Sequence, residues 1–123
     1  MLEAEGRLTP REAEVIGAAL HLAADGPLFP DWEFQTLFGI ERAEVRTVAT
    51  DWPSVDLSDD VVQCAVLGSL NLLIGYPHGH DELMGKTLGA DAKYLHQLFG
   101  RTAVAMGRRH PPDDFVSRLA GNF

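Results

Sequence analysis

Apolar residues recur at helical spacing along most of the chain, and helix-breaking residues divide this pattern into short segments. The first segment begins at Thr9-Pro10, a favourable N-cap followed by a proline at the first helical position. Glu12 stands at the capping-box position, and the helix ends at the Asp-Gly-Pro sequence of residues 25–27. No stretch alternates with a period of two over a useful length, so the sequence predicts helices and no β-sheet.

Two shorter helices are predicted after this breaker. One spans residues 31–38 and is closed by Gly39, and the next spans residues 41–49. It ends before Trp52-Pro53, because the residue that precedes a proline disfavours helical backbone angles. Residues 9–53 therefore form a unit of three helices that resembles a helix-turn-helix arrangement.

The same order of elements returns 50 positions later. A helix capped by Ser58-Asp59-Asp60 runs to Ile74, a short helix spans residues 81–88, and a longer one runs from Asp91 to about Met106. At this offset five identical pairs stand at equivalent positions: Leu20 and Leu70, Leu22 and Leu72, Pro27 and Pro77, Asp31 and Asp81, Gly39 and Gly89. Self-similarity at one fixed offset predicts a tandem duplication, with residues 58–107 as the second three-helix unit.

The two units predict a compact all-α fold in a single domain over residues 1–123, in which residues 108–123 add a linker and a short C-terminal helix. A chain of this length with 46% hydrophobic residues can bury a core without disulfides or metals. The single cysteine, Cys64, excludes an intramolecular disulfide and fits a reducing compartment. The acidic N-terminus lacks the apolar region of a signal peptide, so we expect a cytoplasmic protein.

The helix over residues 61–74 is the most apolar segment of the chain. Its 14 residues include Gln63, Ser69 and Asn71, and a membrane span needs about 20 apolar residues. We therefore expect a buried core helix and no membrane insertion. Because its nonpolar residues surround most of the circumference, it must be covered on several sides, and we expect a second subunit to cover one of them in a homodimer.

Charge is distributed unevenly along the chain. The formal net charge is −8; residues 1–82 hold 4 basic and 15 acidic residues, a net of −11, and residues 83–123 hold 6 basic and 3 acidic residues, a net of +3. The overall sign argues against non-specific nucleic-acid binding. The basic C-terminal end is the one place where an acidic partner could bind.

Residues 81–101 have the spacing of a DNA-binding helix-turn-helix. Gly85 would lie where the two helices cross closely, and Gly89 would make the turn. The second helix would present four polar side chains to phosphates and base edges in the major groove: Lys93, His96, Gln97 and Arg101.

Two features argue against a role in DNA binding. The equivalent helix of the first unit carries Glu41, Glu44 and Asp51, which would repel phosphate, and the second unit offers few cations. A three-helix unit with a glycine turn is also a common way to pack helices without DNA. A DNA-binding regulator is therefore the alternative prediction and not the leading one.

His78-Gly79-His80-Asp81 has the composition of a metal site. Zinc requires three or four converging ligands, and nothing in the sequence brings the remaining histidines to this loop. The simpler interpretation is a polar turn in which His80 or Asp81 caps the next helix. We expect no metal, and a metal-binding protein that uses His78, His80 and Asp81 is a second alternative.

The sequence contains no complete catalytic or cofactor-binding motif. Gly85-Lys86-Thr87 lacks the upstream glycine and the preceding strand of a phosphate-binding loop. Cys64 has no neighbouring base, and Ser69 lacks the second glycine of a nucleophile elbow. We therefore expect a protein that is not an enzyme and holds no cofactor.

Aromatic residues concentrate in Phe29-Pro30-Asp31-Trp32-Glu33-Phe34 and continue to Phe38 and Trp52. Most of them are expected to form core, but a partly exposed Trp32 or Trp52 would anchor a protein partner. The leading prediction is thus a protein-interaction module or homodimer.

The same aromatic segment, with Thr36-Leu37-Phe38-Gly39 and with Leu73-Ile74-Gly75-Tyr76-Pro77-His78-Gly79, resembles the signature of a group of small bacterial helical proteins without an assigned function. The resemblance covers most of residues 8–100. It implies a bacterial cytosolic helical protein and brings no catalytic residue with it.

Overall fold

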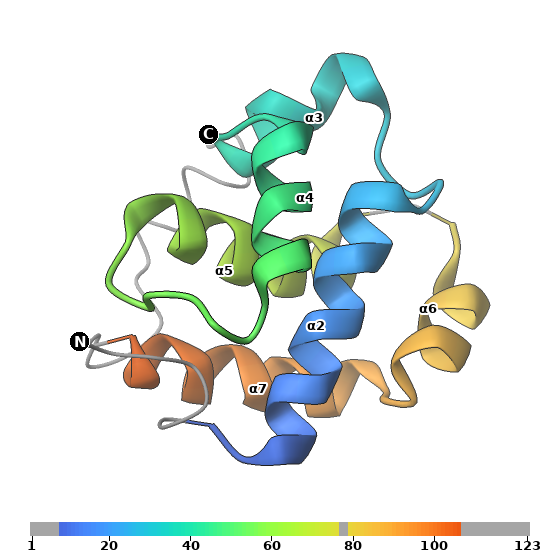
Figure 1. The fold of residues 1–123 in the computed structure, drawn as a ribbon. Coiled ribbons are helices and arrows are strands. Elements are labelled where there is room, and N and C mark those ends of the chain that lie inside the picture. The colour runs from blue at the N-terminus through green and yellow to red at the C-terminus, as the bar shows by residue number, and fades with distance from the viewer. Residues whose placement is uncertain (1–7, 77–78, 107–123) are drawn as a thin grey trace.

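The structure, a computed structural model, describes residues 8–76 and 79–106, and all regular secondary structure in these ranges is helical (Figure 1). The helices are α2 (Pro10–Asp25), α3 (Asp31–Phe38), α4 (Arg42–Asp51), α5 (Asp60–Gly75), α6 (Asp81–Leu88) and α7 (Ala92–Ala105). The all-α prediction is confirmed for this part of the chain. The predicted C-terminal helix and its linker lie outside the described residues.

Local sequence signals set the helix ends. The Thr9 hydroxyl accepts the backbone N–H of Glu12 at 3.1 Å, and the Glu12 carboxylate accepts the N–H of Thr9 at 2.9 Å, which confirms the predicted capping box. Gly39 and Gly89 end α3 and α6 with φ of 77° and 63°. This left-handed conformation favours glycine, so each short helix stops where the sequence indicates.

Helix boundaries in the two halves of the chain correspond at an offset of 50. Helices α2 and α5 begin at residues 10 and 60 and end at residues 25 and 75. Helices α3 and α6 span residues 31–38 and 81–88, and α4 and α7 begin at residues 42 and 92. Only α7 departs from the correspondence, because it has 14 residues where α4 has 10.

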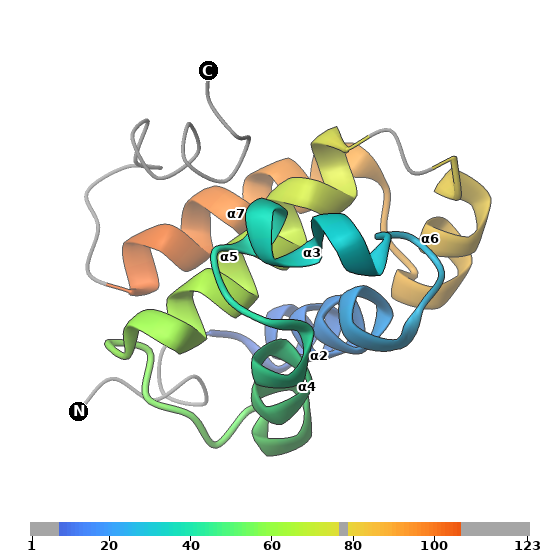
Figure 2. The same ribbon diagram turned by 90° about the horizontal axis from the view of Figure 1, so that it is seen from above.

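The two halves are interlocked and do not form separate bodies. The long helices α2 and α5 contact each other, α4 packs on α2, and α7 packs on α5. Each short helix lies against the long helix of the other half: α3 contacts α5, and α6 contacts α2 (Figure 2). One continuous core therefore serves both halves.

Helix α5 occupies the centre of this core. Ten of its 16 residues are buried, and it contacts α2, α3, α4 and α7. The chain itself therefore covers most of α5, and Val61, Cys64, Asn71 and Ile74 are left half-buried. A second subunit on this helix stays a prediction. At 16 residues α5 is also too short for a membrane span, and no other described helix has the length and apolarity to cross one.

Aromatic side chains fix α3 to this centre. Phe34 and Phe38 stack with ring centroids 4.2 Å apart, and Phe29 meets Phe38 edge to face at 5.4 Å. Gly68 of α5 admits Phe38, because a Cβ at this glycine would lie 3.0 Å from Phe38 Cδ2. The predicted aromatic core is confirmed for these phenylalanines.

Candidate functional site

Trp32 is the most exposed large apolar side chain among the described residues. It lies in the first turn of α3 with 81% of its surface exposed, whereas Phe34 and Phe38 of the same helix are buried. Helix α3 therefore has one face in the core and presents Trp32 on the other. The indole of Trp32 is therefore not part of the core and is accessible at the surface.

Arg42, the first residue of α4, holds the N-terminal end of α3 in place. Its guanidinium donates to the carbonyl oxygens of Ala24 at 3.0 Å and Phe29 at 2.7 Å. It also lies 4.3 Å from the centre of the Phe34 ring and pairs with Asp31 at 2.8 Å. These contacts satisfy carbonyls at the C-terminal end of α2 and tie α2, α3 and α4 together at one point.

Tyr76 connects α3 to the C-terminal end of α5. Its hydroxyl donates to the Glu33 carboxylate at 2.8 Å. This hydrogen bond, with burial and the Glu33 charge as smaller causes, raises the pKa of Tyr76 above its ordinary value. Trp32 thus stands between two residues, Asp31 and Glu33, whose side chains are engaged by other elements of the fold.

Trp52, the other predicted anchor, has a different setting. Its indole N–H donates to the Ala13 carbonyl at 2.8 Å, and its ring lies against Gly17 of α2. It forms one wall of an apolar hollow of about 500 Å³ at the N-terminal half of α2. Trp32 follows Asp31, which pairs with Arg42 at the beginning of α4, whereas Trp52 follows the end of α4, so the structure does not bring the two into one site.

The predicted nucleic-acid residues lie on α7. Lys93, His96 and Gln97 are exposed and share its outer face. Arg101 is exposed as well, but its guanidinium donates to the buried carboxylate of Glu12 on α2. Its positive charge is therefore already paired inside the fold.

Glu12 is the partner that holds Arg101. Burial opposes its ionisation, but the hydrogen bond from Arg101, those from Thr9 and the charge of Arg101 together hold the pKa of Glu12 below its ordinary value. The pair joins the beginning of α2 to α7. It has a structural function in the fold that the sequence pattern did not indicate.

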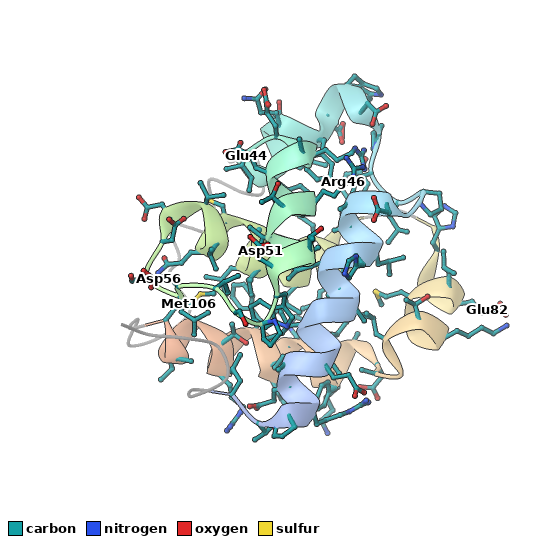
Figure 3. The ribbon with its side chains drawn as sticks, in the orientation of Figure 1. Glu44, Arg46, Asp51, Asp56, Glu82 and Met106 are labelled. Carbon is teal, nitrogen blue, oxygen red and sulfur yellow. The ribbon has the colours of Figure 1, made fainter. Side chains whose placement is uncertain are left out.

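The predicted close crossing of α6 and α7 at Gly85 is wrong. A Cβ at this position would meet no atom within 4 Å. Instead of a tight contact, a hollow opens between the two helices beside Gly85. On the equivalent helix of the first half, α4, the predicted acidic residues Glu44 and Asp51 lie on the same helix as the exposed Arg46 (Figure 3).

The predicted metal ligands are only partly described. His78 lies outside the described residues, His80 is the N-cap residue of α6, and Asp81 is the first residue of that helix. Within residues 8–76 and 79–106, no group of three or more His, Cys, Asp or Glu side chains could hold a metal ion. This part of the structure gives the metal alternative no support.

Comparison of the chain with protein families, curated proteins and solved structures finds no match. The function must therefore be argued from the residues of this chain. Trp32, with the contacts that fix α3 beneath it, is the site that the geometry singles out.

Proposed function

We propose that this chain is a cytoplasmic, non-enzymatic protein-interaction module that anchors its partner through Trp32. The observation that carries the proposal is the 81% exposure of this indole on a helix fixed from three directions. Phe34 and Phe38 hold α3 to the core, Arg42 holds its beginning, and Tyr76 holds Glu33. A partner that encloses Trp32 would remove a large apolar surface from water.

The rigid setting of Trp32 favours binding. Tryptophan is enriched among the residues that dominate the energy of protein interfaces, especially where it enters a pocket on the partner. A helix that is already ordered loses little conformational entropy on association. Because Asp31 and Glu33 flank the indole, the matching surface is an apolar pocket with a basic rim.

A matched pair of variants tests the proposal. Partners are captured from a cell extract with the wild-type protein, and their dissociation constants are measured for Trp32→Ala and for Val104→Ala, which truncates an exposed apolar residue on α7. We expect Trp32→Ala to weaken binding at least about 30-fold, as loss of an interface anchor does. Val104→Ala should change it less than about threefold. Equal effects of the two truncations would exclude Trp32 as the anchor.

We further propose that the chain arose by duplication of a three-helix unit. The common offset of 50 residues in the boundaries of α2 and α5, and of α3 and α6, supports it. The pattern of packing also supports it, because each short helix lies on the long helix of the other half.

The other two predicted roles find less support in the geometry. Of the two cations predicted to contact DNA, Arg101 pairs with Glu12. DNA binding through residues 81–101 would therefore depend on Lys93, which has no ion-pair partner among the described residues. Homodimerisation through α5 has less support, since four helices of the same chain pack on α5 and leave only part of it half-buried. Both remain alternatives to an interaction through Trp32.

A further inference from the structure

A second hollow lies between α6 and α7, in the second half of the chain. It encloses about 680 Å³ and lies where the end of α5 meets the beginning of α7. Its walls are formed by seven residues: Ile74, Met84, Gly85, Gly89, Ala90, Asp91 and Ala92. A volume of this size is within the range of about 300–1,000 Å³ that is usual for ligand-binding pockets.

The corresponding place in the first half is filled by an arginine side chain. At the offset of 50, Ala92 corresponds to Arg42, Ile74 to Ala24 and Met84 to Phe34. Arg42 donates to the Ala24 carbonyl at 3.0 Å and lies 4.3 Å from the centre of the Phe34 ring. In the second half Ala92 leaves open space at this position, and the guanidinium of Arg11 lies at the edge of the hollow, where it donates to the Gly89 carbonyl at 2.7 Å.

Three residues at the hollow have smaller side chains than the residues at the corresponding positions of the first half. Ala92 stands for Arg42, Gly85 for Gln35 and Ala90 for Ile40. Packing does not require a glycine at position 85, because a Cβ there would meet no neighbouring atom within 4 Å. A glycine inside a helix is unfavourable, so Gly85 lowers stability while it leaves the hollow open.

Features that attract a cation remain at the hollow. The C-terminal turn of α5 at Ile74 presents the negative end of a helix dipole, as the end of α2 does to Arg42. The Asp91 carboxylate adds a full negative charge, and only one of its oxygens, Oδ1, accepts the Tyr94 N–H at 2.8 Å. The Gly89 carbonyl is occupied, because Arg11 donates to it at 2.7 Å. Ile74, Met84 and Asp91 are thus the expected contacts.

We propose that this hollow binds the guanidinium of an arginine side chain on a partner protein. The volume exceeds what one arginine side chain fills, so there is room for the neighbouring groups of a polypeptide. The charge that attracts a basic polypeptide comes from Asp91 and from residues 1–82, which are net −11, because residues 83–123 are net +3. The proposal does not depend on Trp32, because the two sites lie on different helices.

Chemical-shift titration of the full chain tests the site. The probe is a capped Ala-Arg-Ala tripeptide, and the control is the same tripeptide with citrulline, which has nearly the same shape but no charge. We expect the arginine peptide to shift the amide signals of Gly85, Gly89 and Asp91. The citrulline peptide should bind at least tenfold more weakly. Equal binding of the two peptides would overturn the proposal.

Two variants locate the binding and a third controls for charge. Ala92→Arg supplies the missing guanidinium from within the chain, and Gly85→Gln restores the side chain that Gln35 has in the first half; each should reduce peptide affinity at least tenfold. Ala43→Arg adds the same charge at an exposed position of α4 and should leave affinity within about twofold. Unchanged affinity in both Ala92→Arg and Gly85→Gln would refute the site. Affinity for capped arginine alone that equals that of the tripeptide would refute a polypeptide as the occupant.

Discussion

Replacement of Arg42 by alanine tests the central contact of the first half of the fold. The Arg42 side chain is only 20% exposed, and its guanidinium contacts the Ala24 and Phe29 carbonyls and the Phe34 ring. Arg42→Ala removes all of these contacts at once. Arg46, which donates to the Ala24 carbonyl at 3.3 Å, is then the remaining cation at the end of α2.

The magnitude follows from the individual contacts. A charge-assisted hydrogen bond contributes about 1.5–3 kcal/mol, and we take about 1 kcal/mol for each of the two short ones because water replaces part of the loss. Contact with the Phe34 ring adds about 0.5–1 kcal/mol. The ion pair adds little, since the Asp31 side chain is 93% exposed. We therefore expect the free energy of unfolding to fall by about 2.5–3 kcal/mol.

Urea denaturation followed by circular dichroism measures this change, with the m-value unchanged if the variant still folds in two states. Arg46→Ala is the comparison variant, because Arg46 comes from the same helix and is 50% exposed, and it pairs with Asp25 and donates to the Ala24 carbonyl only at 3.3 Å. It should cost less than about 1 kcal/mol. Arg42→Lys should recover less than half of the loss, because an ammonium cannot reproduce the planar fork of donors. If Arg42→Ala and Arg46→Ala destabilise equally, Arg42 does not hold the three helices together.

Two further perturbations test the packing and the electrostatics. Gly85→Ala should raise the free energy of unfolding by about 0.5–1 kcal/mol, because a Cβ there meets no atom within 4 Å and glycine disfavours helix. Gly68→Ala should lower it by about 1–3 kcal/mol, because its Cβ would lie 3.0 Å from Phe38 Cδ2; thermal unfolding that shifts both variants in one direction would contradict this reasoning. Glu12→Gln should cost about 1–2 kcal/mol at pH 7 through loss of its charge-assisted bond to Arg101. The pKa of Glu12 is lower in the folded state than its value of 4.5 in the unfolded chain, so its contribution to stability is complete above pH 4.5 and is lost as the pH falls through the folded-state pKa. The difference in free energy of unfolding between the wild type and Glu12→Gln should therefore shrink below pH 4.5.

The sequence predicted those parts of the fold that depend on local chemistry. The short helices over residues 31–38 and 81–88 were placed correctly because Gly39 and Gly89 end them with a conformation that other residues rarely adopt. The capping box at Thr9 and Glu12 has a signature within four residues.

Contacts between distant segments carried no such signal. Periodicity showed that α5 must be covered, but it did not show that α3 and α7 cover it within one chain. The sequence does not indicate the role of Arg42, because its hydrogen-bond acceptors are backbone carbonyls, which every residue has. The offset of 50 contains one signal, because it aligns Arg42 with Ala92. A large side chain in the first half thus corresponds to a small one beside the hollow between α6 and α7.

The exchange of short helices between the halves has a consequence for how the chain folds. Because α3 is seated on α5 and α6 on α2, neither half has a complete hydrophobic core of its own. An intermediate with one half folded and the other unfolded would expose to water the apolar surface of a long helix on which a short helix packs. The described helices therefore form a single cooperative unit. A destabilising change in either half is therefore transmitted to the stability of the whole, including the helix that carries Trp32.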